Sequence, residues 1–462
     1  MNRLTTNTFL FIWLSLMLFS CRSPETCDKN NATHRNLSQI IDRDTLIAVT
    51  STNSTDYFVY RGKPMGFHLE LLEKFTEHIG VELQIIVENN IDKSILLVQE
   101  GKADVLAQSL TISNFRKTKI AFTIPITETK QVLIQRICDT MITSPLELGN
   151  RTIYIQKSSV FNDRLMNLAN EIAKPITVIQ LDSLEVEEII AKVSNGEFDY
   201  TVCDESVALL NQQYYSNINA SIAVSLDQHI AWAVRKSSNI LLDSLNIWIK
   251  HYTQSIDFIH LYNKYYKHAG LRVNVQSDYF SGAKGQISDY DEWIKKYSKQ
   301  INWDWRLVAS LIYQESRFNP IAKSWAGAYG IMQIMPATAE TLNIDSLSGI
   351  EAQIAAGIRL IQMIDNRVPQ NITDTNIRQK YILAGYNVGY GHVEDAIRLA
   401  EKYGDNPYKW ENNVAKYLIN LSGSDYFTDS VVQFGYCNGL RPVKYIKEIF
   451  ERYEHYKNVV PE

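Results

Sequence analysis

The sequence has few cysteines, little net charge and almost no long apolar run. Five cysteines occur among 462 residues, and their spacing fits no metal-binding motif. The formal net charge is −5 and is spread along the chain, so we expect no basic surface for nucleic acid. Beyond the N-terminus, no segment is long and apolar enough to cross a membrane. We expect no nucleic-acid partner, no metal site and no cofactor.

The one long apolar run lies at the N-terminus. Eleven residues, 9–19, are interrupted only by Ser15 and follow Arg3. This run is too short to span a bilayer and is typical of a secretion signal. Leu18-Phe19-Ser20-Cys21 resembles a lipoprotein processing box, which implies a lipid on Cys21. The alternative is an ordinary signal peptide with an incidental cysteine.

We therefore predict a signal peptide over 1–20 and a polar tether over 21–38. The lipid would hold the chain at the cell envelope, in the outer membrane facing the periplasm. An oxidising compartment permits a disulfide. Cys138 and Cys203 form the pair to consider, since both fall within one predicted lobe.

Strand and helix patterns alternate over 39–268. Strands are predicted at 45–49, 81–87 and 104–107, with an apolar helical stripe from Phe67 to Ile79 between the first two. A second copy of this order follows, with strands at 152–155 and 176–181 and helices at 160–172 and 185–193. This order argues for mostly parallel sheets. Two similar α/β lobes predict a clam-shell with a ligand cleft between them.

Short motifs in this region resemble the amino-acid-type periplasmic solute-binding proteins. They are Gly62-x-x-x-Gly66-Phe67, Gly101-x-x-Asp104, Thr111-x-x-x-x-Arg116 with Phe122-Thr123-Ile124-Pro125, and Asp204. The resemblance implies that Arg116 grips a ligand carboxylate, which suits a guanidinium fork, and that Asp204 holds an ammonium group. The alternatives are a solvated surface arginine and an aspartate that only caps a helix.

Strand signals nearly vanish after a predicted linker at 269–285. Residues 240–266 before it are predicted to be helical, and a run of helices follows over 286–462. We therefore predict a two-lobed α/β domain, similar to periplasmic binding proteins, over 39–268, followed by an all-α domain over 286–462.

Glu315 stands out within the helical region. Val308, Leu311, Ile312 and Glu315 fall on one helical face, and Asn319-Pro320 is expected to end that helix. A carboxyl group on an apolar face keeps its proton to higher pH, because burial disfavours the charged form. A general acid for glycosidic cleavage needs that property. The alternative is a glutamate at a helix end that reaches into water.

Three motifs here resemble the soluble lytic transglycosylase domain, which implies a lysozyme-like fold. They are Glu315-Ser316 with Pro320, then Gly327-x-x-Gly330-x-Met332-Gln333-x-Met335-Pro336-x-Thr338, then Tyr386-Asn387-x-Gly389. The resemblance implies that Glu315 is the single catalytic acid. It implies substrate-binding roles for Ser324, Gln333, Tyr386, Asn387 and Tyr445, and it implies that Tyr445 reaches toward the acid. The alternatives are a loop serine at 324 and a core tyrosine followed by a turn asparagine at 386–387.

No second acid lies between Glu315 and Glu340, although glycosidases commonly use two carboxyl groups. The resemblance implies a lyase acting on peptidoglycan, in which the muramic 6-hydroxyl closes a 1,6-anhydro ring. The whole arrangement resembles the membrane-bound lytic murein transglycosylases. That implies glycan strands as substrate, with cell-wall peptides or amino acids as ligands of the first domain. The alternatives are a hydrolysing muramidase and a ligand-sensing lipoprotein with an inactive lytic domain.

Overall fold

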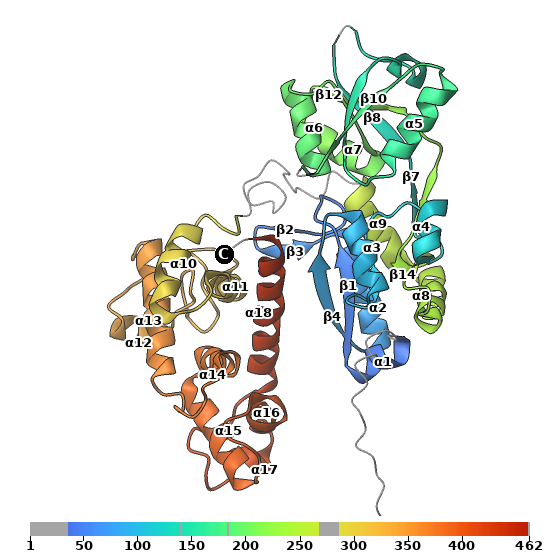
Figure 1. Ribbon diagram of the computed structural model, residues 1–462. Helices are drawn as coiled ribbons and strands as arrows, with labels where there is room; N and C mark the ends of the chain where they lie inside the picture. The colour runs from blue at the N-terminus through green and yellow to red at the C-terminus, as the bar shows by residue number, and fades with distance from the viewer. Residues whose placement is uncertain (1–35, 139, 183, 268–285, 461–462) are drawn as a thin grey trace, which may run out of the picture.

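The computed structural model describes residues 36–138, 140–182, 184–267 and 286–460. Cys21, the predicted signal peptide and the predicted linker at 269–285 lie outside these ranges. A two-lobed α/β domain is followed by a helical domain, as predicted (Figure 1). No helix among the described residues is long and apolar enough to cross a membrane. The same ranges hold no group of three His, Cys, Asp or Glu side chains placed to bind a metal ion.

The first lobe is built on a five-stranded sheet in the order β4-β1-β5-β14-β6, in which only β14 runs against the others. Strand β1, which lies between β4 and β5, is buried along most of its length, because helices cover both faces of a mostly parallel sheet. The predicted stripe on α2 is confirmed, since Phe67, Leu71 and Phe75 are buried. The strands are β1 (Thr45–Thr50), β4 (Glu82–Val87), β5 (Val105–Leu106), β6 (Ala121–Phe122) and β14 (Ala233–Val234). The helices are α1 (Leu37–Asp42), α2 (Phe67–Ile79), α3 (Ile91–Gln99), α4 (Asn114–Lys119), α8 (Asn239–Tyr252) and α9 (Ile256–Tyr262).

The second lobe repeats the scheme with the sheet order β10-β9-β11-β8-β12. Only β8 runs against its neighbours. The lobes are joined by a small antiparallel pair of strands, β7 and β13. The elements are β7 (Thr127–Thr129), β8 (Gln131–Arg136), β9 (Thr152–Gln156), β10 (Thr177–Leu181), β11 (Tyr200–Asp204), β12 (Ile218–Ala223), β13 (Gln228–Ile230), η2 (Pro145–Leu148), α5 (Phe161–Glu171), α6 (Val186–Asn195) and α7 (Glu205–Gln212).

Two local features of this domain add to or differ from what the sequence suggested. Residues 240–266 are helical, as predicted, but they form α8, α9 and a π-turn, η3 (Asn263–Lys267), because the Ser255 hydroxyl caps a new helix by accepting a hydrogen bond from the Phe258 amide. Cys138 and Cys203 are free. Antiparallel pairing sets Cys203 opposite Val132, so Cys138 lies six residues further along, roughly 20 Å away along the strand.

The second domain is helical throughout its described residues, apart from isolated bridges in the loop after α11. Its elements are α10 (Asp291–Ser298), η4 (Lys299–Ile301), α11 (Trp305–Ser316), α12 (Pro336–Thr341), α13 (Ile350–Asp365), α14 (Thr375–Val388), α15 (Tyr390–Lys402), η5 (Trp410–Val414), α16 (Ala415–Asn420), α17 (Ser424–Phe427) and α18 (Leu440–Val459). Helix α11 ends earlier than expected. Arg317 and Phe318 both adopt left-handed backbone angles, so the turn precedes Pro320.

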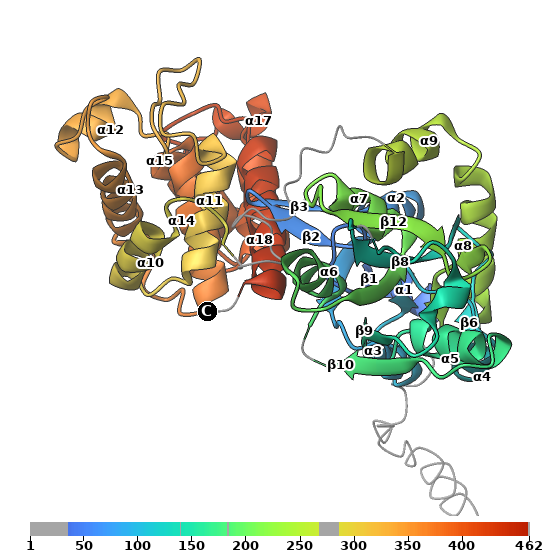
Figure 2. The same cartoon turned by 90° about the horizontal axis from the view of Figure 1, so that it is seen from above.

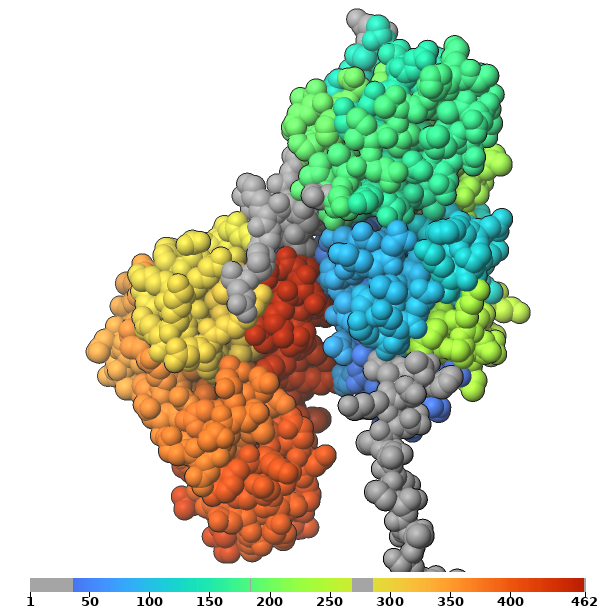
Figure 3. All heavy atoms as spheres, viewed as in Figure 1, coloured from blue at the N-terminus to red at the C-terminus, as the bar shows by residue number. Residues whose placement is uncertain are grey.

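Helix α18 lies between the two domains (Figures 1 and 2). One side packs on α11, and the other faces β4 and the hairpin β2 (Phe58–Tyr60) and β3 (Lys63–Met65). The space-filling view shows α18 in red, wedged against the blue lobe (Figure 3). We call the hairpin, α18 and the end of α11 the hairpin joint. The hairpin packs closely against the helical domain, since Val59 of the hairpin belongs to the hydrophobic core of that domain.

Candidate active site and ligand cleft

Glu315 occupies the last turn of α11, where its apolar face meets α18. The Tyr445 hydroxyl on α18 donates a hydrogen bond to Glu315 Oε1. The two helices are fixed by polar contacts one turn away, because the Ser310 hydroxyl donates to the Ile449 carbonyl over 2.7 Å. The predicted pairing of Tyr445 with Glu315 is thus present.

The surroundings of Glu315 favour its protonated form. Burial raises the pKa of the carboxyl from its ordinary value of 4.5 to about 7, while the Tyr445 hydrogen bond and the charge of Arg441 act in the opposite direction. The groups that shift this pKa include no second carboxylate. The side chain is partly buried, which disfavours the alternative of a fully solvated helix-end glutamate.

Tyr386 and Asn387 belong to α14, and Tyr386 is close enough to Glu315 for the two groups to interact electrostatically. The Tyr386 hydroxyl donates to the Met332 carbonyl over 2.7 Å. Burial raises the pKa of Tyr386 well above its ordinary value, and the charge of Glu315 raises it further. Asn387 Oδ1 is buried and accepts no hydrogen bond. That oxygen is available to a donor such as an acetamido N–H of a sugar.

Gln333 and Ser324 instead shape the loop that follows α11. Gln333 has φ +49°, and its amide Nε2 donates to the carbonyls of Ala322 at 3.0 Å and Gly330 at 2.9 Å. Ser324 Oγ accepts from the Ala328 amide at 3.0 Å. These contacts match the loop-serine alternative for Ser324, and its contacts do not include Glu315.

The sequence interpretation missed two residues that anchor this loop. The Ser316 hydroxyl donates to the Ile331 carbonyl at 2.7 Å, and Gln353 Oε1 accepts from the Ile331 amide at 2.9 Å. Gly330, at φ +81°, leaves no room for a Cβ beside Gln353. Ser316 belongs to the Glu315-Ser316 motif, whereas Gln353 lies on α13 and belongs to none of the motifs recognised in the sequence.

A groove of about 730 Å³ runs between this loop and α12. Its lining includes Ala322, Tyr329, Gly330 and Pro336, and so it shares Ala322 and Gly330 with the Gln333 contacts. The volume falls within the range of ligand-binding sites. Glu315 is not among its lining residues; it is connected to this loop through Ser316 and the Tyr386–Met332 contact.

Arg116 lies in the cleft between the lobes and is only 5% exposed. The surface-arginine alternative is therefore wrong. Its guanidinium donates to the Thr111 carbonyl at 3.0 Å and reaches the Ser158 carbonyl of the other lobe at 3.5 Å. Burial lowers its pKa to about 10, which leaves it charged at neutral pH.

Asp204 ends β11 on the opposite side of the same cleft. It stands at the N-cap position of α7 but makes no side-chain cap hydrogen bond, which removes the capping alternative. Its Oδ1 atom is buried and has no hydrogen-bond partner. Burial raises the pKa of Asp204 to about 7, with Asp56 adding to the shift and Arg116 opposing it.

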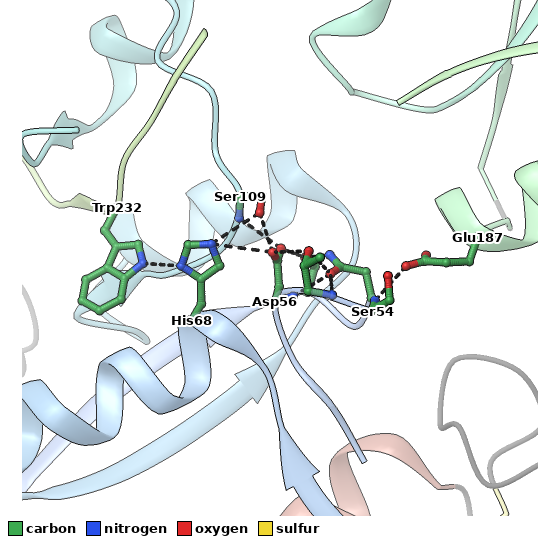
Figure 4. Close-up of polar contacts among 9 residues, drawn as sticks. Ser54, Asp56, His68, Ser109, Glu187 and Trp232 are labelled. Carbon is green, nitrogen blue, oxygen red and sulfur yellow. Dashed lines mark hydrogen bonds and ion pairs between the residues drawn. The ribbon is translucent and has the colours of Figure 1, made fainter. Parts of the chain in front are cut away.

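Figure 4 shows polar residues at the cleft that the sequence interpretation missed. Asp56 accepts from the Ser109 hydroxyl at 2.6 Å and the Ser109 amide at 3.0 Å. His68 Nδ1 accepts from the Trp232 indole N–H at 2.8 Å, so this ring nitrogen carries no proton. Across the cleft, Glu187 Oε1 accepts from the Ser54 amide at 2.7 Å.

Position along the strands could have indicated several of these residues. Asp56 and Ser109 follow β1 and β5, and Glu185 follows β10. Ligands of open α/β sheets bind beyond the carboxyl ends of the strands. Which of the polar residues there face the cleft depends on packing between the lobes.

Two family profiles match the chain. "Bacterial extracellular solute-binding proteins, family 3" matches residues 46–268, and "Transglycosylase SLT domain" matches residues 292–409. Among solved structures, the P235GK mutant of ArgBP from T. maritima is similar, with TM-score 0.45 and 23% identity over 50% of this chain and 99% of that one. An ancestral arginine-binding protein is similar at TM-score 0.44 and 23% identity, covering 48% of this chain and 99% of its own.

A solute-binding domain joined to a helical domain with a buried acid defines a class of enzyme, the lytic transglycosylases of the bacterial cell wall. The "Membrane-bound lytic murein transglycosylase F" of Desulfosudis oleivorans is 30% identical over 421 residues, which cover 91% of each chain. That of Pseudomonas fluorescens Pf0-1 is 29% identical, over 96% of this chain and 88% of its own. The chain belongs to the membrane-bound lytic murein transglycosylase F family. It is a lytic transglycosylase that acts on peptidoglycan.

Proposed function

We propose that the enzyme cleaves the β-1,4 bond between N-acetylmuramic acid and N-acetylglucosamine with a single acid, Glu315. The observation that carries this proposal is a carboxyl group buried between α11 and α18 and held by the Tyr445 hydroxyl, a setting that raises its pKa to about 7. Among the described residues, no second carboxylate contributes to this shift. Protonated Glu315 gives its proton to the glycosidic oxygen as the C1–O bond breaks. The muramic 6-hydroxyl then attacks C1 and returns its proton to Glu315.

This sequence of steps balances without water. One C–O bond breaks, one forms within the same sugar, and Glu315 ends in its starting protonation state. The attack is intramolecular, so the proximity of the hydroxyl replaces a second reactant. We assign Asn387 Oδ1 to the acetamido group and Tyr386 to the wall beside Glu315. Gln333 and Ser324 are assigned to shaping the groove that receives the glycan.

Product analysis tests the lyase proposal. Purified sacculi digested with the enzyme are expected to release muropeptides ending in 1,6-anhydro-muramic acid, each lighter by one water than the reducing form. Mass spectrometry distinguishes the two. Reducing ends alone would identify a hydrolysing muramidase, and no products from a correctly folded protein would support the alternative of an inactive lytic domain that only senses a ligand.

The first domain is assigned the binding of a cell-wall peptide or amino acid, with Arg116 on its carboxylate and Asp204 on its ammonium group. The buried guanidinium and the unpartnered Asp204 oxygen support this assignment. Both groups line one cavity between the lobes, and closure of such lobes around a ligand is a common domain motion.

Ligand binding is further proposed to bias the catalytic domain through the hairpin joint. Asp56 at the cleft directly precedes Tyr57, whose hydroxyl lies 2.9 Å from His455 Nδ1 on α18. The hairpin turn ends in Gly62, which packs against Tyr313 and Phe318 on either side of Glu315 in the sequence. Coupling of two sites requires a shared element with two arrangements, and this joint contacts both.

We also propose that a lipid on Cys21 anchors the chain in the outer membrane, facing the periplasm. The apolar run at 9–19 followed by Cys21 supports this assignment. Cys21→Ser is expected to move the protein from the outer-membrane fraction of lysed cells to another fraction, measured by immunoblot. Unchanged outer-membrane sedimentation of Cys21→Ser would contradict the anchor.

A further inference from the structure

The cleft between the lobes holds more acidic than basic groups. Its lining contains Asp56, Glu185 and Asp204, against Arg116 as its one basic side chain among the described residues. Asp56 is already satisfied, since its two carboxylate oxygens accept hydrogen bonds from Ser51 and Ser109. His68 Nε2 also lies 3.6 Å from Asp56 Oδ1. Neither Asp204 nor Glu185 forms an ion pair within the part of the chain that the structure describes.

Unpartnered acceptors also face this cavity. Gln108 is 3% exposed, and its side-chain Oε1 accepts no hydrogen bond; Asp204 Oδ1 is likewise buried and unpartnered. A buried acceptor without a donor is costly. Both atoms would be satisfied by a ligand that brings N–H groups into the cavity.

Glu185 lines the same cavity but comes from a different segment of the chain than Arg116 and Asp204. It precedes α6 in the second lobe, and its Oε2 accepts from Gln156 Nε2 at 2.9 Å. The Asn89 side chain of the first lobe also hydrogen-bonds to it. The Glu185 carboxyl group therefore has hydrogen-bond partners in both lobes. Burial and the negative charges of Glu187 and Glu188 raise the pKa of Glu185 to about 7, while the Asn89 and Gln156 amides oppose the shift. A cation beside this carboxyl group would favour its ionised form.

We propose that the cleft selects an α-amino acid with a cationic side chain and that Glu185 binds this cation. The inference rests on the proposed ligand role of Arg116 and Asp204. Arg116 takes the carboxylate and Asp204 the α-ammonium group. The second cation then meets Glu185 and its amide neighbours. The cavity is about 70 Å³, smaller than such a ligand, so uptake includes separation of the lobes at the Ser54–Glu187 contact.

Two pairs of ligands, each a cationic and a neutral amino acid, test the inference on the full-length protein in detergent. Arginine is compared with citrulline, which has the same shape, and lysine with norleucine, which lacks the ε-amino group, by isothermal titration calorimetry. Arginine is expected to bind at least about tenfold more tightly than citrulline, because a charge-assisted hydrogen bond in a buried site contributes that much. Glu185→Gln should remove this preference while citrulline binding stays within about twofold.

Matched variants separate this inference from the proposed function. Glu171→Gln changes an exposed glutamate of the same lobe and should leave both affinities unchanged. Arg116→Ala should abolish binding of every ligand, and retained citrulline binding by Glu185→Gln shows that this variant folds. Equal affinity for arginine and citrulline in the wild type would overturn the inference but leave the ligand role intact. Absence of any binding would overturn both.

Discussion

Glu315→Gln is expected to lower the rate of peptidoglycan cleavage by about 10³-fold. The amide keeps the shape of the side chain and its place beside Tyr445, but it cannot deliver a proton to the glycosidic oxygen, and general acid catalysis contributes about 10²–10⁴-fold. The rate of soluble product release from labelled sacculi measures the loss. Glu401→Gln, which changes an exposed glutamate on α15, is the control and should retain full activity.

Glu315→Gln is also expected to stabilise the fold. This increase in stability would distinguish loss of the acid from damage to the structure. The folded-state pKa of Glu315 is raised above its unfolded value, so ionising it costs stability as pH rises from about 4.5 to about 7. Above pH 7 that cost is about 3 kcal/mol. Glu315→Gln removes it and should melt at a higher temperature than the wild type at pH 8, with little difference at pH 4. Destabilisation at pH 8 would contradict the buried acid.

The pH profile gives a further signature of the acid. Only protonated Glu315 can start the reaction, so kcat/KM should fall as pH rises past about 7. Tyr445→Phe removes a hydrogen bond that favours the ionised form, and this alkaline limb should therefore move to higher pH. A limb that stays in place or moves to lower pH would mean that another group limits the rate.

Gly62→Ala is expected to open the hairpin joint. Gly62 has φ +75°, and an added Cβ would lie 2.7 Å from Phe318 Cε2 and 2.9 Å from Tyr313 Cδ2. The Gly62 carbonyl also accepts a hydrogen bond from the Tyr456 hydroxyl at 2.7 Å. Left-handed strain and overpacking together cost about 3 kcal/mol. We expect a lower melting temperature and, because Tyr313 and Phe318 flank Glu315, an altered rate of cleavage.

Gly80→Ala is a control that separates the backbone strain of a left-handed residue from the steric clash of the added Cβ. Gly80 has a closely similar φ of +73° at the end of α2, but an added Cβ would meet nothing within 4 Å. Its substitution should cost only about 1 kcal/mol and leave cleavage unchanged. If both variants alter cleavage equally, or neither does, the joint does not link the domains.

Local pattern was sufficient for the order of elements and for placing Glu315 on an apolar helix face. The stripe from Phe67 to Phe75 and the face carrying Glu315 follow from helical periodicity, which depends on neighbours in sequence. Predicted ends were less accurate. Helix α11 stopped at two left-handed residues before Pro320, and a serine cap divided the helix at 255. Such ends depend on single hydrogen bonds that compete with helix propagation.

Contacts between residues far apart in the chain could not be predicted from the sequence pattern. The approach of Tyr445 to Glu315 joins residues 130 positions apart; the sequence suggested it only through family resemblance. Cys138 and Cys203 share a lobe, as expected, but the strand register separates them. Gln353, Gln108 and Glu185 have ordinary neighbours in sequence, and only their burial beside loops or cleft walls makes them candidates.

The sequence by itself determined the two kinds of domain, their order, and the apolar helix face on which Glu315 lies, because periodicity and short motifs are local properties of the chain. Only the tertiary structure decided the pKa of Glu315, the orphaned oxygen of Asp204 and the seating of Gly62 against Phe318. Each of these depends on which atoms exclude water or fill space around a group, and those atoms come from segments far apart in the chain.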